Sequence, residues 1–147
     1  MNIISKNRKV YHDYEILDEK ECGIQLLGTE VKSLRVGKCN LKGSFCRFMK
    51  DELWLFDSHI SKYEQADKFT QQDETRTRKI LMHRKELNKW MGRTNKEQHL
   101  TIVPLSIYFN EDNKVKLKVA LCKGKKLYDK RQSEKEKDVK RKLQQKY

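Results

Sequence analysis

The sequence lacks any long hydrophobic run. Its 147 residues include one proline, Pro104, and no apolar stretch approaches the roughly 18 residues that a membrane span needs. Residues 1–14 contain no apolar segment of the kind found in a secretory signal peptide. We therefore expect a chain that neither spans a membrane nor is secreted, and we place it in the cytoplasm.

Metal-binding and catalytic motifs are also missing. None of the four cysteines is spaced Cys-x-x-Cys, and no two histidines lie three to five residues apart, so we expect neither metal nor cofactor. The chain has no Gly-x-Ser-x-Gly, phosphate-binding glycine loop or His-Glu-x-x-His. His12 and Asp13 suggest a base and its orienter, but adjacent strand residues point to opposite faces. We predict that the protein is not an enzyme.

Positive charge is abundant and unevenly placed. Lys and Arg number 34 against 21 Asp and Glu, a net charge of +13, which attracts polyanions and nucleic acid above all. Residues 123–147 carry +7 of this charge and few apolar side chains. Such a segment buries too little to offset its ordering entropy, so we expect it to be loose when free. The predicted folded body ends near residues 122–128.

Strands dominate the predicted body. Short apolar runs around polar turns predict three hairpins, over residues 14–27, 44–56 and 100–121. Pro104 marks an edge position or a bulge, because it has no N–H to donate. Two helices are predicted over residues 30–36, capped by Thr29 and ended by Gly37, and over residues 76–91, ended by Gly92.

This element order favours a mostly β fold with helices, specifically an OB-like barrel, because closure removes exposed sheet edges. A split α+β sandwich is the alternative architecture. The aromatic residues of the second hairpin lie in apolar runs, which favours a place in the core; they are Phe45, Phe48, Trp54 and Phe56.

Three segments combine cations with features suited to nucleic acid. Residues 7–14 contain two cations followed by two tyrosines, which suits base stacking beside phosphate contact. Lys32 and Arg35 lie three apart on the first helix and would share a face as a phosphate clamp. Residues 123–131 surround Tyr128 with cations, beside a glycine that allows close approach. Each segment could instead be a solvated basic surface.

The same residues resemble the SsrA-binding protein (small protein B) family. The matching segments run in the family's order: Asn-Arg-Lys at 7–9, His-Asp-Tyr at 12–14, Gly-Thr-Glu-Val-Lys-Ser-Leu-Arg at 28–35, Asn-Leu at 40–41, His-Ile at 59–60, Arg-Thr-Arg-Lys-Ile-Leu at 76–81, Val-Pro-Leu at 103–105, Tyr-Phe at 108–109 and Gly-Lys-Lys-Leu-Tyr-Asp-Lys-Arg at 124–131. The resemblance implies an OB-like RNA-binding barrel over residues 1–128 and a basic C-terminal tail over residues 129–147. It implies that the tail is disordered when free and helical on the ribosome.

The resemblance also implies partners and site residues. The partners are transfer-messenger RNA, through the elbow of its tRNA-like domain, and the decoding region of the small ribosomal subunit, where the tail enters. By position, RNA contact falls to Asn7, Arg8, Lys9, Glu21, Lys32, Arg35, Asn40, Lys125, Lys126 and Tyr128. The ribosome-directed tail residues are Asp129, Lys130, Arg131, Lys135, Lys137, Val139, Lys140, Arg141, Lys142 and Leu143.

Together these features predict a monomeric, non-enzymatic adaptor for ribosome rescue by trans-translation. One alternative is a general single-strand RNA-binding protein of the OB or cold-shock kind, which would need aromatic side chains exposed along its strands. A second alternative is a small basic nuclease.

Overall fold

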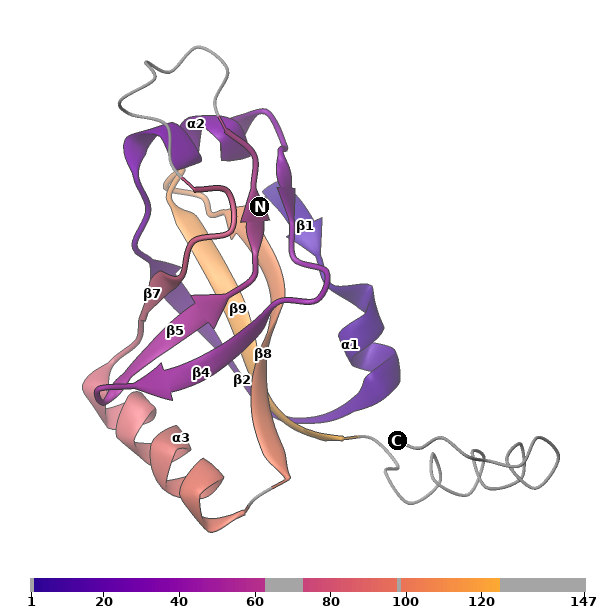
Figure 1. The fold of residues 1–147 in the computed structure, drawn as a ribbon, viewed down its shortest axis with the longest axis vertical. Coiled ribbons are helices and arrows are strands. Elements are labelled where there is room, and N and C mark those ends of the chain that lie inside the picture. The colour runs from indigo at the N-terminus through magenta and orange to yellow at the C-terminus, as the bar shows by residue number, and fades with distance from the viewer. Residues whose placement is uncertain (1, 63–72, 98, 125–147) are drawn as a thin grey trace, which may run out of the picture.

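The structure, a computed structural model, describes residues 2–62, 73–97 and 99–124 (Figure 1). Within these residues strands predominate, and three helices lie around them. In chain order the elements are β1 (Asn2–Lys6), α1 (Arg8–Asp13), β2 (Tyr14–Ile24), α2 (Gly28–Arg35), β3 (Cys39–Asn40), β4 (Phe45–Met49), β5 (Glu52–Phe56), β6 (His59–Ile60), β7 (Arg78–Leu81), α3 (Arg84–Lys96), β8 (Leu100–Phe109) and β9 (Val115–Gly124).

Six strands close into a barrel. They are paired in the order β8-β4-β5-β7-β2-β9, and β9 pairs again with β8, so the ring has no free edge. Strand β1 adds antiparallel to one end of β8, while Ile102 nearer the other end of β8 pairs with Cys46 of β4. The closed ring of strands confirms the predicted OB-like barrel and not the split sandwich, because a split sheet would leave edges unpaired.

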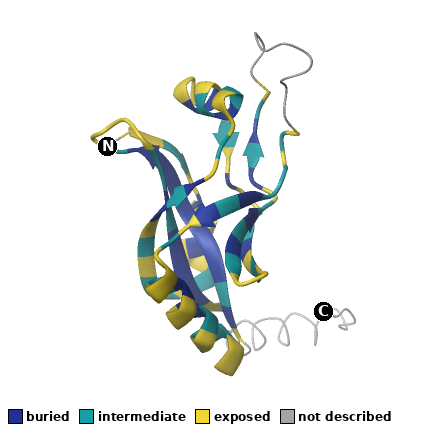
Figure 2. Cartoon of the chain, turned by 90° about the vertical axis from the view of Figure 1, so that its left-hand side faces the viewer, coloured by how far each residue is buried: buried dark blue, intermediate teal, exposed yellow. Residues whose placement is uncertain are grey.

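The barrel interior is the main hydrophobic core (Figure 2). Leu53, Leu117 and Val119 are fully buried there, as their alternation along the strands requires. A smaller cluster, which includes Val10 of α1 and Leu105 of β8, lies where α1 covers the outside of β8 and β9. Burial of each such Leu or Val contributes about 1.5–3 kcal/mol to the free energy of folding. The barrel interior is therefore the hydrophobic core that the sequence predicts.

Two predicted hairpins are confirmed. Strands β4 and β5 pair from Phe45–Phe56 to Met49–Glu52, and β8 pairs with β9 along its length. Pro104 lies at a register shift in the β8–β9 ladder, so it marks a bulge and not an edge. In addition, Gly37 follows α2 with a φ of +76°, the left-handed helix end that was predicted.

The predicted hairpin over residues 14–27 is wrong. Residues Tyr14–Ile24 form one continuous strand, β2, which pairs with β9 over most of its length. Residues 18–23 look like a polar turn because their side chains alternate between the barrel interior and solvent. Cys22 and Ile24 point inward, whereas Glu19 and Glu21 are exposed.

The predicted helix over residues 76–91 is also wrong at both ends. Ile80 lies in β7, where it pairs with Leu53 on one side and Ile24 on the other. The helix begins only at Arg84 and continues through Gly92 to Lys96. Ile80 fits a helical period with Leu87 by chance, because both are core residues placed there by different elements.

Smaller predictions also need correction. Helix α2 begins at Gly28, so Leu27 and not Thr29 occupies the N-cap position. Strand β1 and helix α1 were not predicted. His12 and Asp13 end that helix, with His12 Nδ1 3.1 Å from Asp13 Oδ1, so the argument that placed them on opposite strand faces fails.

The prediction that the aromatic residues of the second hairpin lie in the core is mostly wrong. Only Phe48 packs against the core. Phe45, Trp54 and Phe56 are half-buried, and they alternate with buried Cys46, Leu53 and Leu55, so they lie on the outside of the barrel. The boundary at residue 128 and the state of the tail concern residues outside the described ranges.

Candidate nucleic-acid interface

Helix α1 presents two of the predicted contact residues to solvent. Arg8 and Lys9 are exposed in its first turn. Asn7 is buried instead: its backbone N–H donates to Leu105 O at 2.8 Å and its side chain donates to Pro104 O at 3.3 Å. Asn7 therefore fastens α1 to the bulge of β8, while the two cations remain available to a ligand.

Helix α2 carries a second pair of exposed cations, Lys32 and Arg35. The Arg35 guanidinium lies 4.9 Å from the ring centroid of Phe109 and donates to Asn113 Oδ1 at 3.3 Å. These contacts tie α2 to the end of the β8–β9 hairpin. Asn40 is exposed in β3, where its side-chain oxygen accepts a hydrogen bond from the backbone N–H of Lys42.

A buried ion cluster holds α2 in place. Glu30 is fully buried and accepts hydrogen bonds from Arg76 at 2.7 and 2.8 Å and from Arg78 at 2.8 and 3.0 Å. Arg78 is buried as well and also donates to Ser58. Burial by itself would raise the pKa of Glu30, but the bonds from Arg76 and Arg78 outweigh it and hold that pKa below its usual value.

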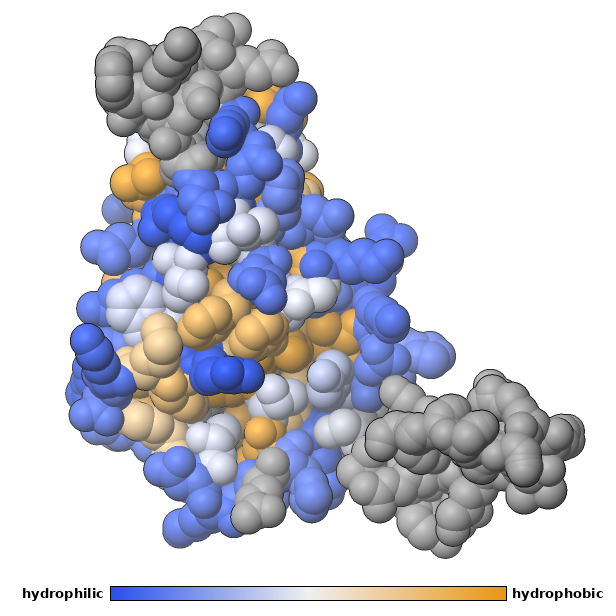
Figure 3. Space-filling model, viewed as in Figure 1, coloured by the Kyte–Doolittle hydropathy of each residue, from blue (hydrophilic) through white to orange (hydrophobic). Residues whose placement is uncertain are grey.

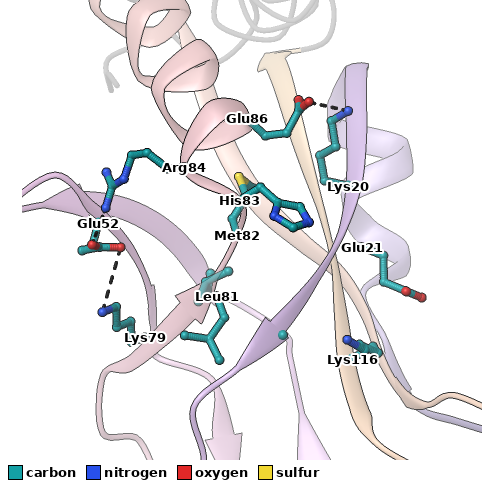
Figure 4. A pocket seen from close by; sticks show the side chains of 12 residues that line it. Lys20, Glu21, Glu52, Lys79, Leu81, Met82, His83, Arg84, Glu86 and Lys116 are labelled. Carbon is teal, nitrogen blue, oxygen red and sulfur yellow. Dashed lines mark hydrogen bonds and ion pairs between the residues drawn. The ribbon is translucent and has the colours of Figure 1, made fainter. Parts of the chain in front are cut away.

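Glu21 lies beside a cleft on the outside of the barrel (Figure 4). The cleft has a volume of about 630 Å³ and lies over β2, β7 and the start of α3. Tyr108, which is buried in β8, donates its hydroxyl to the Glu21 carboxylate. Burial and then this carboxylate raise the pKa of Tyr108, so the phenol stays a donor. The cleft residues are Lys20, Glu21, Gly23, Glu52, Lys79, Ile80, Leu81, Met82, His83, Arg84, Glu86 and Lys116.

The cations of the cleft differ in how far they are neutralised. Lys20 lies 3.1 Å from Glu86, and Lys79 lies 4.0 Å from Glu52. Lys116 of β9 has no carboxylate of the described residues within ion-pair distance. This lysine, together with Leu81, which is 48% exposed, offers the cleft both a cation and an apolar contact.

The predicted contact residues do not gather in one place. Helices α1 and α2 lie on separate parts of the body (Figure 1), and Glu21 belongs to a third element, β2. The structure brings Glu21 together with Lys79, Leu81 and Lys116, none of which was predicted. The polar face of β9 could have indicated Lys116 as a contact residue. Leu81 could not be found in this way, because the sequence placed it in a predicted helix and not in a strand. The remaining predicted residues lie outside the described ranges: Lys125, Lys126, Tyr128 and the tail residues from Asp129 to Leu143.

The described residues contain no helix long and apolar enough to cross a membrane. Within the same ranges, no three His, Cys, Asp or Glu side chains come together as metal ligands would. The four cysteines are unpaired thiols. Burial raises the pKa of Cys22, Cys39 and Cys122 to about 12, so they are poor nucleophiles.

Comparison with known proteins decides what kind of barrel this is. The model of the SmpB protein family matches residues 4–147. The chain belongs to the SmpB family. SsrA-binding proteins of Carboxydothermus hydrogenoformans and Helicobacter hepaticus are 49% and 50% identical to it, over 97% and 96% of this chain and 93% and 90% of theirs.

A solved SmpB structure also shares the fold. It is described as "tmRNA-SmpB: a journey to the center of the bacterial ribosome". Its chain is 46% identical, with a TM-score of 0.70 over 94% of this chain and 95% of that one. The likeness therefore extends over nearly the whole of both SmpB chains.

Proposed function

We propose that this chain is a non-enzymatic adaptor of the cytoplasm. It binds the tRNA-like domain of transfer-messenger RNA and delivers it to stalled ribosomes for trans-translation. The observation that carries the proposal is the match of its barrel, over nearly its full length, to the SmpB chain described with tmRNA and the ribosome.

The barrel suits recognition of a folded RNA by shape and backbone. Its cations lie on several elements, with exposed Arg8 and Lys9 on α1, exposed Lys32 on α2 and half-buried Lys116 on β9. A curved RNA surface could meet such separated cations, whereas a short single strand would reach few of them. The Glu21 carboxylate, held by Tyr108, adds an acceptor for nucleobase or ribose donors at the cleft.

Binding measurements with the purified full-length chain test this function. We expect a tRNA-like domain to bind more tightly than a mature tRNA or a single strand of equal length. With about four to eight phosphate contacts, log affinity should fall against log salt with a slope of about −3 to −7. A nearly flat salt response, or tighter binding of the single strand, would contradict the proposal.

Lys116 offers a sharper test at the cleft. Replacing it, Lys116→Ala, should weaken binding about tenfold and reduce the salt slope by about 1, because a charged contact to phosphate is lost. Lys96→Ala is the control, since Lys96 is an exposed lysine at the far end of α3. If both variants weaken binding equally, the cleft has no special role.

We assign delivery, as distinct from RNA binding, to the basic tail over residues 129–147. Truncation after Lys130 removes most of the tail but none of the cleft. It should leave the affinity for the tRNA-like domain within a few-fold of the full chain and abolish peptide tagging on stalled ribosomes. Normal tagging by the truncated chain would show that the tail is dispensable.

A further inference from the structure

The outer face of β4 and β5 carries an aromatic surface that no predicted contact residue explains. Phe45 and Phe56 are directly opposite each other in the ladder, and their rings stack with centroids 5.3 Å apart and planes 4° apart. Trp54 lies on the same face of β5, and its indole N–H donates to Met49 O at 3.1 Å, which fixes the ring. Figure 3 shows hydrophobic side chains gathered over β4 and β5 among hydrophilic ones.

Arg47 completes this surface, which we call the aromatic face (Phe45, Arg47, Trp54 and Phe56). Its guanidinium lies 5.1 Å from the Phe45 centroid and 6.0 Å from the Phe56 centroid. The residue is exposed, and no carboxylate of the described residues pairs with it. A planar cation therefore lies over this pair of rings, with its charge left for a ligand.

The aromatic face is continuous with the cleft. Trp54 pairs with Lys79 across the β5–β7 ladder, and Lys79 and Leu81 line the cleft on the same side of β7. Beyond them, Leu81 pairs with Gly23 of β2, next to Glu21. A ligand that lies in the cleft could thus extend over β7 onto the aromatic face without leaving the barrel surface.

These observations favour a nucleobase as the occupant. Aromatic rings and arginine planes are the side chains on which proteins stack unpaired bases, and every base offers a π-face. The cations at and beside the face, Arg47, Lys50 and Lys79, complement phosphate charge. We infer that the aromatic face is a stacking site for unpaired nucleotides of the RNA whose folded part lies in the cleft. The inference rests on the proposed function, whose folded RNA it extends.

Substitution of the ring pair tests the stacking site. Phe45→Ala with Phe56→Ala should weaken binding of a tRNA-like domain about 5- to 100-fold, the range found when a base-stacking ring is removed. Phe45→Tyr with Phe56→Tyr keeps both rings and should bind within about threefold of the natural chain. Ile3→Ala is the control, because Ile3 is 55% exposed and lies on β1, away from this face. Urea unfolding of each variant separates lost contacts from lost stability.

Tryptophan fluorescence gives a readout that a purely structural role would not produce. A base stacked beside Trp54 should quench its emission, whereas Trp90 belongs to the buried side of α3 and should not respond. Addition of the tRNA-like domain should therefore quench the natural chain and leave Trp54→Phe unchanged. An unstructured RNA octamer serves as a second probe, since it can stack without any folded elbow.

The outcomes distinguish this inference from the proposed function. If the natural chain binds the tRNA-like domain but the alanine pair binds equally well and Trp54 is not quenched, the stacking site is overturned and the function stands. If the octamer quenches Trp54 but the tRNA-like domain does not, and the alanine pair abolishes that quenching, the stacking site stands and the proposed function fails. If the alanine pair binds the tRNA-like domain normally but no longer sediments with ribosomes, the face docks on the ribosome and not on the RNA in the cleft, which overturns the inference.

Discussion

Neutralising Glu30 should destabilise the protein strongly, although the substitution changes only one atom of the side chain. In Glu30→Gln the amide keeps the size of the carboxylate, but its NH2 group faces guanidinium donors and the negative charge is gone. Arg78, whose side chain is 0% exposed, then becomes a buried cation without a counter-ion. Arg76 is 29% exposed and can turn toward water, so it adds less.

The magnitude follows from that burial. Removing one partner of a buried pair costs about 3–5 kcal/mol, a large share of a total stability of about 5–15 kcal/mol. For a domain of this size the melting temperature should fall by about 6–20 °C, at about 2–4 °C per kcal/mol. Urea unfolding followed by circular dichroism measures the change in unfolding free energy.

Glu52→Gln is the matched control. Glu52 also pairs with two cations, Arg84 and Lys79, but their side chains are 51% and 32% exposed. Exposed pairs contribute about 0–1 kcal/mol, so this variant should unfold almost like the natural chain. The reasoning is refuted if Glu30→Gln falls within about 1 kcal/mol of Glu52→Gln. A further expected result is weaker RNA binding by Glu30→Gln, because α2 carries Lys32 and Arg35.

Two other predictions concern pH and thiol chemistry. Since the pKa of Glu30 is lowered in the folded state, its contribution is present above the pKa of the unfolded chain and is lost as pH falls through the folded-state pKa. The urea midpoint should therefore drop less steeply with acid in Glu30→Gln than in the natural chain; parallel curves would contradict this. Because burial raises the pKa of Cys22 and Cys122 to about 12, a thiol reagent at mildly alkaline pH should react slowly with both until urea unfolds the protein. Rapid labelling of either cysteine in the native chain would show that the barrel opens there.

The parts of the fold that could be predicted depend on residues that are close together in the sequence. The β4–β5 and β8–β9 hairpins join neighbouring strands through short turns, so apolar runs around a polar turn are enough to indicate them. Gly37 ends α2 for an equally local reason, because its positive φ suits glycine. Composition likewise indicated a basic protein, and the ordered motifs from residue 7 to residue 131 indicated its family.

Only the tertiary structure decided the pairings between distant segments. Four residues, Arg78–Leu81, are a strand because β5 and β2 hold Ile80 between them, and nothing within the segment distinguishes this from a helical turn. The same holds for β2, whose alternating polar residues are recognised as one strand only because they pair with β9.

The aromatic face shows the same limit most clearly. Both faces of β4 hold apolar side chains, so alternation reveals two faces but not which one the barrel encloses. The neighbouring strands make that choice. They bury Cys46, Leu53 and Leu55 and leave Phe45, Trp54 and Phe56 outside. The cleft beside Glu21 arises similarly from β7, β2 and β9, which are neighbours in the barrel although they are far apart in the sequence. A closed barrel fixes the inward side of each strand through its partners on both sides.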